Sequence, residues 1–274
     1  MSPEDFDRLQ TLVATRTGNR LRRDRMNLAE HRLGPVARRA GFDSVDTMLA
    51  TLWSKPVAGL AWDVIESQLN GETWFRRDRE AFLTMSQELL PALSQARRGQ
   101  TLRIWSAGCS TGQEAWSLAM CALDLNLDVE VVGSDLNRIA LQKAHKGAYT
   151  GFEIQRGLAA GTMVRWFRPE GELWTADDTL KQVVRFERLN LLDMPSADDE
   201  APRFDVIFCR HVLIGMEPAA RALVLQGLER RLVDDGCLFL APSENLNGES
   251  LAFRPVSGRR GLHVKSPTFL QDAA

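Results

Sequence analysis

From residue 101 onward, short apolar segments alternate with segments of helical periodicity, and this alternation limits the possible folds most. The expected strands and helices follow one another as Leu102–Ser106, Gln113–Leu125, Val129–Ser134, Arg138–Lys146, Asp205–Cys209, Pro218–Leu232 and Cys237–Ala241. Such alternation is typical of an α/β protein with a parallel, doubly wound sheet. Ala252–Val256 and Gly261–Lys265 flank the turn SGRR and predict a late antiparallel hairpin. The hairpin departs from the pattern of dinucleotide-binding dehydrogenases.

Residues 1–90 contain few β-branched runs and predict a separate, helical N-terminal domain. The polar stretch Ser94–Gln100 predicts a linker, so that the second domain spans residues 101–274. Within the first domain, residues 16–39 hold eight arginines against two acidic residues, a local net charge of +6. Leucines recur there at helical spacing, which predicts one or two basic amphipathic helices.

The alternation breaks between Tyr149 and Arg188. Phe167–Trp174 and Val183–Phe186 predict a small antiparallel excursion with Gly171 at a turn. We therefore expect an inserted β-subdomain at about residues 152–187.

Composition excludes several classes of protein. With 34 Lys+Arg and 36 Asp+Glu the net charge is −2, which argues against nucleic-acid binding. No apolar run approaches the roughly 20 residues that span a bilayer, and the acidic start lacks the layout of a secretory signal. The four cysteines, Cys109, Cys121, Cys209 and Cys237, show no CxxC spacing. We expect free thiols, no metal site and a cytoplasmic monomer that does not insert into membranes.

Two features indicate an adenosine cofactor. In IWSAGCSTGQE, Gly108 and Gly112 let the backbone turn tightly between a strand and a helix, although a plain turn would look the same. Asp135 ends the next strand, VVGSD, where a carboxylate accepts hydrogen bonds from ribose hydroxyls. The alternative role for Asp135 is a helix N-cap. Nothing matches the phosphate-binding pattern GxxxxGK[ST].

Five stretches in order resemble those of the chemotaxis receptor methyltransferase (CheR) family. They are ETWFRRD (72–78), WSAGCSTGQE (105–114), DLNRIALQKAHKGAY (135–149), RLNLLD (188–193) and FDVIFCRHVLI (204–214). The resemblance implies a Rossmann-like class I methyltransferase sheet, an inserted β-subdomain and a helical N-terminal domain. It also implies S-adenosylmethionine as the cofactor, with S-adenosylhomocysteine as its product. The implied reaction is methylation of glutamate side chains on the cytoplasmic helical domain of chemoreceptors.

The same resemblance implies the site residues. The residues expected at the cofactor are Gly71, Thr73, Arg77, Gly108, Glu114, Asp135, Asn190, Leu191, Arg210 and His211. Arg77 is the expected catalytic residue and would orient the reacting carboxylate by a charge-assisted hydrogen bond. A glutamate is already ionised at neutral pH, with a pKa of about 4.3, so no general base is needed. The alternatives are a salt bridge for Arg77 and a turn for Asn190.

The basic segment fits this interpretation, because receptor helices that carry substrate glutamates are expected to be acidic. Arg20, Arg22, Arg23 and Arg25 would bind that partner by charge. The alternative is a solvated charged face.

The sequence departs from the family pattern at three places. Gly71 stands where the family usually has Asn, His211 replaces the Asn after Arg210, and Gly215 with Met216 replaces an aromatic pair. These changes leave open a degenerate cofactor-binding module or an enzyme of a pilus-linked or other chemosensory array. A small-molecule methyltransferase is a third alternative, against which the basic helices and ETWFRRD argue. The insert also looks short, which predicts a member that does not need a receptor's C-terminal peptide tether.

Overall fold

The structure, a computed structural model, describes residues 1–55, 57–194, 203–246 and 248–265. Contacts divide the chain into two units. The first comprises Met1–Asn70 and Gly215–Arg221, and the second comprises Gly71–Ile214 and the chain from Ala222 onward. The N-terminal part of the first unit therefore ends at Asn70, whereas the sequence predicted a boundary at residue 90.

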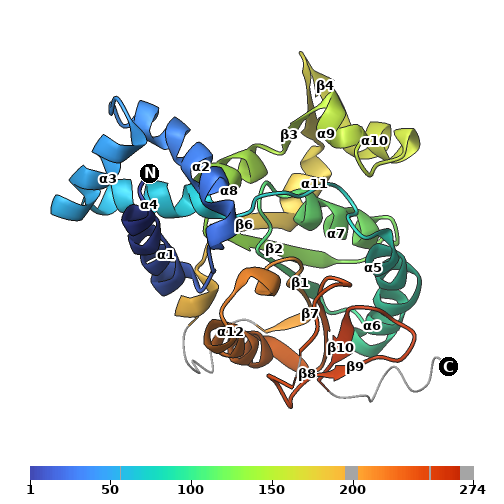
Figure 1. Cartoon of the computed structure of the whole chain (residues 1–274). Coiled ribbons are helices and arrows are strands. Elements are labelled where there is room, and N and C mark those ends of the chain that lie inside the picture. The colour runs from blue at the N-terminus through green and yellow to red at the C-terminus, as the bar shows by residue number, and fades with distance from the viewer. Residues whose placement is uncertain (56, 195–202, 247, 266–274) are drawn as a thin grey trace. The chain divides into compact units, whose positions relative to one another are not determined.

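The first unit is helical. Its helices are α1 (Pro3–Thr17), η1 (Arg23–Arg25), α2 (Met26–Arg39), α3 (Val45–Ser54) and α4 (Ala58–Gln68) (Figure 1). Helix α1 begins where the Ser2 hydroxyl accepts a hydrogen bond from the Asp5 amide, and it ends at Gly18, whose φ is +72°. The predicted basic helices are only partly present, because residues 18–22 lie outside helices and α2 begins at Met26. Phe6, Leu9, Leu33 and Met48 are among the fully buried side chains of its core.

The second unit is built on a seven-stranded sheet in the order β6-β2-β1-β7-β8-β10-β9 (Figure 1). The strands are β1 (Leu102–Ala107), β2 (Val129–Asp135), β6 (Val184–Arg188), β7 (Phe204–Phe208), β8 (Leu232–Phe239), β9 (Arg254–Pro255) and β10 (Leu262–Val264). The first five strands in this order pair in parallel, and β10 pairs antiparallel with β8 and β9. The predicted parallel sheet with a late hairpin is confirmed.

Helices precede β1 and connect most of the strands that follow it. They are α5 (Arg79–Thr84), η2 (Met85–Leu89), α6 (Leu90–Arg97), α7 (Gln113–Leu123), α8 (Arg138–Lys146), α11 (Asp178–Val183), η3 (Leu191–Asp193), η4 (Leu213–Gly215) and α12 (Pro218–Arg231). The predicted linker is wrong for residues 94–97, which complete α6. Leu90 and Leu93 are fully buried in the core of the sheet, and Arg97 forms ion pairs with Asp205 and Asp235. These contacts explain why the segment after residue 71 belongs to the second unit.

The insert is a three-stranded antiparallel sheet in the order β3-β5-β4. It consists of β3 (Ala148–Thr150), α9 (Gly151–Gln155), α10 (Ala160–Trp166), β4 (Phe167–Glu170) and β5 (Leu173–Ala176) (Figure 1). The predicted bounds of 152–187 are wrong at both ends. Val184–Arg188 forms β6, which pairs in parallel with β2, and the Phe186 ring packs 5.3 Å from Trp116.

Candidate functional site

The turn between β1 and α7 lies against the end of β2. The amides of Gly108 and Cys109 both donate to the Ser134 carbonyl, at 2.8 and 2.9 Å. Gly108 has φ +84°, and a Cβ there would lie 2.5 Å from Val212 Cγ2. The turn therefore requires glycine both for its conformation and for its close approach to the residues that follow β7.

Asp135 is oriented by backbone amides. Its Oδ2 accepts from the Ser110 amide and its Oδ1 from the Asn137 amide, each at 2.8 Å. The alternative role of N-cap belongs instead to Asn137, whose Oδ1 accepts from Ile139 and Ala140 at the start of α8. Asp135 is only half-buried, so its carboxylate can accept further hydrogen bonds.

Arg210 is the centre of a buried ionic network. Because its side chain is 0% exposed, water does not solvate its charge, and groups of the protein must balance it. Nη1 donates to Glu114 Oε2 at 3.1 Å, and Nη2 donates to the Arg77 carbonyl at 2.6 Å and to Asp78 Oδ2 at 2.5 Å. Ser106 Oγ donates to the other Glu114 oxygen at 2.7 Å. Burial raises the pKa of Glu114 in spite of Arg210 and Ser106.

Asp78 links Arg210 to His211. His211 Nε2 lies 2.8 Å from Asp78 Oδ2. Burial alone would raise the pKa of Asp78, but hydrogen bonds from His211 and the charge of Arg210 outweigh it, and the pKa is lowered. Because this carboxylate is ionised, Nε2 of His211 carries the proton. His211 therefore has a defined partner at the position where the family usually has Asn.

The loop of residues 71–78 lies beside the turn of residues 108–112 between β1 and α7, which is the expected cofactor turn. Ser110 Oγ donates to the Gly71 carbonyl at 2.8 Å. Arg77 Nη1 donates to the Glu72 carbonyl at 2.6 Å, and its guanidinium stacks 4.3 Å from the centre of the Trp74 ring. Burial lowers the pKa of Arg77. Thr73 is half-buried in the same loop.

Asn190 and Leu191 follow β6. The Leu189 amide donates to the Asp135 carbonyl at 3.1 Å, so this segment joins the end of β2. Asn190 caps η3 by accepting from the Leu192 amide at 3.3 Å, which is the turn role considered as the alternative. Leu191 is buried.

The predicted residues thus gather where parallel strands end, the usual ligand-binding edge of such a sheet. Sequence reasoning missed two residues there, Asp78 and Glu244. Asp78 closes the ETWFRRD stretch, but its positive φ of 55° and its partners depend on the fold. Glu244 lies beyond β8, accepts hydrogen bonds from the amides of His211 and Ile214, and carries no sequence signal.

The residues present fit the cofactor that the resemblance implies. Asp135 can accept from ribose hydroxyls, and the carboxylate of Glu114 suits a cationic amino-acid end. Gly108 provides a side-chain-free turn that precedes both residues in the chain. Among the residues that the structure describes, the buried Nε atoms of Arg77 and Arg210 have no hydrogen-bond partner. This donor and acceptor set is suited to a charged nucleoside ligand.

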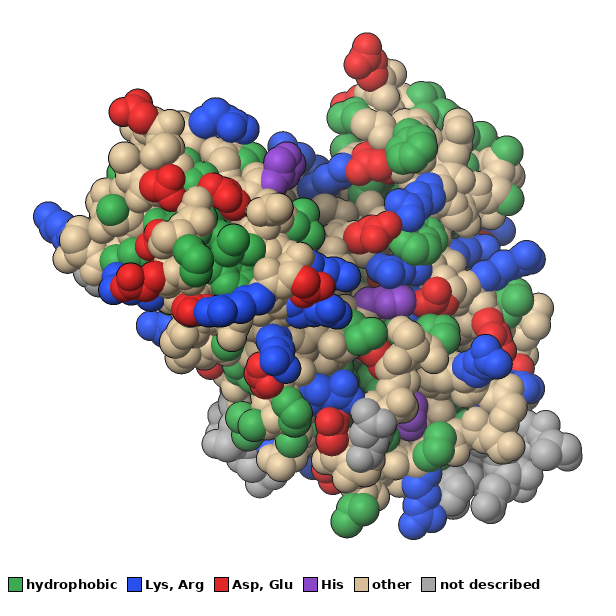
Figure 2. Space-filling view, viewed as in Figure 1, with side chains coloured by type: hydrophobic (Ala, Val, Ile, Leu, Met, Phe, Trp, Pro, Cys, Tyr) green, Lys and Arg blue, Asp and Glu red, His purple; other side chains and the backbone are tan. Residues whose placement is uncertain are grey.

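The four predicted docking arginines belong to the first unit, and three of them form ion pairs. Arg22 pairs with Asp24 at 2.8 Å, Arg23 with Asp7 at 2.5 Å and Arg20 with Glu217 at 3.6 Å. Arg25 is exposed. Figure 2 shows acidic and basic side chains interspersed over the face in view. The local charge is therefore lower than the sequence count indicates.

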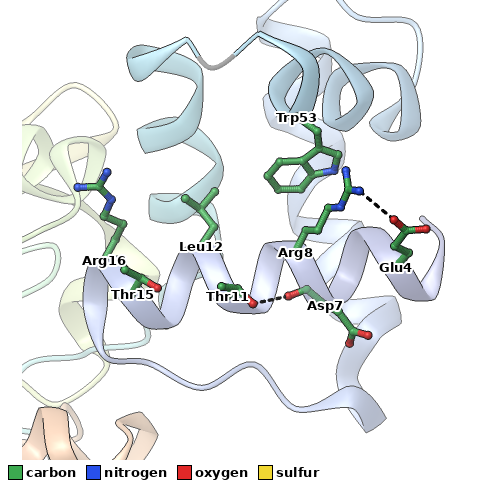
Figure 3. A pocket seen from close by; sticks show the side chains of 8 residues that line it. All are labelled: Glu4, Asp7, Arg8, Thr11, Leu12, Thr15, Arg16 and Trp53. Carbon is green, nitrogen blue, oxygen red and sulfur yellow. Dashed lines mark hydrogen bonds and ion pairs between the residues drawn. The ribbon is translucent and has the colours of Figure 1, made fainter.

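A groove of about 600 Å³ runs along α1 in the first unit (Figure 3). Leu12 and Trp53 line it together with charged side chains, including the Arg8–Glu4 ion pair at 2.9 Å. None of the predicted cofactor residues lines this groove.

All four cysteines are buried and free. Within the described ranges, no helix is long and apolar enough to cross a membrane, and no cluster of three or more His, Cys, Asp or Glu side chains is arranged to hold a metal ion.

Comparison with known proteins identifies the second unit. The family model described as CheR methyltransferase, SAM binding domain, matches residues 71–262. Chemotaxis protein methyltransferase Cher2 of Pseudomonas putida is 30% identical, with 89% of this chain and 91% of that protein covered. Chemotaxis protein methyltransferase 1 of Pseudomonas aeruginosa is 32% identical, covering 89% and 90%. The probable biofilm formation methyltransferase WspC of Pseudomonas aeruginosa is 35% identical, covering 66% and 43%. The chain therefore belongs to the CheR methyltransferase family and carries its S-adenosylmethionine-binding domain.

Proposed function

We propose that this protein transfers a methyl group from S-adenosylmethionine to glutamate side chains of chemoreceptors, forming methyl esters. Family membership supports methylation in chemosensory signalling, and the arrangement of Arg77 supports a carboxylate as the acceptor. This arginine is half-buried beside Trp74, and its loop contacts both the cofactor turn and Arg210. A guanidinium in such a place binds a carboxylate more strongly than one in open water.

The chain's own residues would position the reactants. The cofactor supplies an electrophilic methyl group on a positively charged sulfur. Arg77 would orient the substrate carboxylate, which needs no base because it is already ionised. Opposite charges disappear as the methyl group moves, so a partly dry site favours transfer. Burial of Glu114 and Arg210 beside the site is consistent with such an environment.

Contacts within the protein accommodate two of the departures from the family pattern. The Gly71 carbonyl accepts from Ser110, so the loop is held without an asparagine side chain. A Cβ at Gly215 would lie 2.9 Å from Asn19 Oδ1 within the first unit, so glycine suits this position. We therefore favour an active enzyme over a degenerate cofactor-binding module.

The partner that we propose is the cytoplasmic helical domain of a chemoreceptor, which would place this protein in the cytoplasm. Arg22, Arg23 and Arg25 are exposed and would attract acidic receptor helices. Exposed ion pairs such as Arg22–Asp24 contribute about 0–1 kcal/mol, so a partner's carboxylates could replace them.

A second candidate is an enzyme of another chemosensory array. The 35% identity to a probable biofilm formation methyltransferase favours it. The chemistry would be the same, and only the receptor would differ.

The decisive experiment is methyl transfer from radiolabelled S-adenosylmethionine to membranes of the source cells. Label released as methanol by mild base reports carboxyl esters. We expect base-labile label on a receptor-sized band and little label with the Arg77→Ala variant. Absence of label from a preparation that binds S-adenosylhomocysteine would contradict the proposal and favour the binding module. Label on a band of another array's receptor would support the second candidate.

A further inference from the structure

Two guanidinium groups lie over the same tryptophan ring. The Cζ atoms of Arg77 and Arg156 lie 4.3 and 4.0 Å from the centre of the Trp74 ring. Arg77 comes from the loop of residues 71–78, whereas Arg156 follows α9 in the insert. A planar guanidinium stacked on an indole is held in a defined orientation while its N–H groups remain available.

Close packing fixes Arg156 relative to this loop. Gly157 has φ +107°, and a Cβ there would lie 1.8 Å from the Phe75 carbonyl oxygen, so the two backbones are in direct contact. The Phe75 ring packs edge-on against Tyr149 and Phe167 of the insert, at 5.0 and 5.4 Å. Arg156 and Arg77 are thus held by one rigid cluster.

The charges around Trp74 are unbalanced. Glu72 serves both arginines: its carbonyl accepts from Arg77, and its carboxylate accepts from Arg156 Nη2 at 3.0 Å. The nearby carboxylate of Asp78 already binds Arg210 and His211. Arg156 therefore pairs with this carboxylate, whereas Arg77 contacts a neutral carbonyl oxygen, and a further anionic group would be stabilised beside the two guanidinium groups.

The existing partner of Arg156 can be displaced. The side chains of Arg156 and Glu72 are 43% and 55% exposed, so their ion pair is a weak surface interaction. A substrate carboxylate could take the place of Glu72 without moving the stacked guanidinium.

We propose that Arg156 is a specificity-determining residue that binds a second carboxylate of the substrate, next to the glutamate that Arg77 orients. The inference rests on the proposed function and deepens it. The preferred substrate would be a helical segment in which the methylated glutamate has an acidic neighbour on the same face. Residues three and four positions apart share a helix face.

The test uses the full chain and synthetic helical peptides. Each peptide carries one target glutamate, with either Glu or Gln three or four residues away. For the wild-type chain we expect KM to be about tenfold lower for the best peptide with an acidic neighbour, the size of effect of a charge-assisted contact. Arg156→Gln should abolish this preference, so that the KM ratio of the two peptides approaches one, and Arg156→Lys should restore part of it.

Arg165→Gln is the matched control. Arg165 also lies in the insert, stacks on a tryptophan (Trp166, 4.8 Å) and forms an ion pair (Asp124, 3.1 Å). The Arg165→Gln variant should retain the preference for a peptide with an acidic neighbour. An equal loss in the Arg165 and Arg156 variants would overturn the assignment, because it would show a general charge effect.

A binding measurement separates this inference from the proposed function. Peptides in which the target glutamate is replaced by Gln lack the target carboxylate but keep the neighbouring one. Calorimetric titration in the presence of S-adenosylhomocysteine should show tighter binding of the acidic-neighbour peptide to wild type than to Arg156→Gln. Equal binding would overturn the inference while methyl transfer to membranes still supported the function. Failure of methyl transfer to every peptide and to membranes would contradict the function itself.

Discussion

The backbone amide of His211 donates a 2.9 Å hydrogen bond to Oε2 of Glu244. The Ala241 amide donates to the same oxygen and the Ile214 amide to Oε1, each at 2.9 Å. Glu244 is 6% exposed, so these amides replace its hydration. His211 has φ +60°, an unfavourable conformation for a residue with a side chain. The carboxylate of Glu244 thus stabilises the strained turn that presents Arg210 and His211 to the site.

We expect Glu244→Gln to weaken both the fold and the site. An amide side chain has one acceptor oxygen and two N–H donors, so at least one of the three backbone amides loses its partner. The free energy of unfolding should fall by about 1–3 kcal/mol, and the Kd for S-adenosylhomocysteine should rise. Urea unfolding and calorimetric titration measure these changes. Glu172→Gln, at an exposed position, is the control, and equal behaviour of the two variants would contradict the role of Glu244.

The cofactor turn can be tested with a pair of glycine variants. Gly108 and Gly171 both have positive φ, but only at Gly108 would a Cβ collide, with Val212 at 2.5 Å. We expect Gly108→Ala to lower Tm and to weaken S-adenosylhomocysteine binding by about tenfold or more. The reason is that Val212 or the backbone of the turn must move to make room for the added Cβ. Gly171→Ala should show only the smaller cost of the backbone conformation. If the two variants lose equal stability and affinity, the turn does not require a close approach at residue 108.

Loss of the Arg77 guanidinium should reduce turnover. With Arg77→Ala the substrate carboxylate loses its orienting partner, and kcat/KM for receptor membranes should fall by about a hundredfold. Arg79→Ala is the matched control, because Arg79 lies two positions away and is exposed. A value of kcat/KM close to wild type in the Arg77 variant would show that another group orients the carboxylate.

The basic segment should act on the receptor and not on the cofactor. The triple reversal Arg22→Glu, Arg23→Glu and Arg25→Glu should raise KM for receptor membranes, most strongly at low ionic strength, because exposed charges are screened by salt. The Kd for S-adenosylhomocysteine should stay at the wild-type value. Lys55→Glu, an exposed reversal in the same unit, should have little effect. An unchanged KM in the triple variant would show that these arginines form a solvated surface and do not bind the receptor.

The ion pair between Arg97 and Asp235 predicts a defined pH dependence of stability. The hydrogen bonds from Arg97 lower the pKa of Asp235 below its value in the unfolded chain. A lowered folded pKa stabilises the protein above the unfolded pKa of about 3.9, and this contribution disappears as pH falls through the folded value. Asp235→Asn should therefore be less stable than wild type at neutral pH, and the difference should shrink below about pH 4. Urea unfolding of both chains across this range measures it, and a difference that is constant with pH would show that the ion pair does not cause it.

Local patterns of the sequence predicted the parts of the fold that depend on neighbouring residues. The helix over Arg138–Lys146 has the predicted bounds, because its apolar spacing and the flanking Asn137 and Gly147 are local signals. The glycine turn and the aspartate that ends β2 were predicted for the same reason. The family resemblance added the reaction and most of the site residues.

Which segments pack together depends on contacts between residues that are far apart in the chain. Val184–Phe186 looks like any short apolar strand, and its pairing with β2 depends on partners about fifty residues earlier in the chain. The sequence around Leu90 and Leu93 is compatible with a linker helix or a core helix. Only the burial of these leucines against the sheet distinguishes the two. The buried partnership of Arg210 with Glu114 and Asp78, and that of Glu244 with three distant amides, likewise have no local signal. Burial and hydrogen bonding between distant residues exist only once the chain has folded, so the sequence determined the kind of site and the fold determined how it is held.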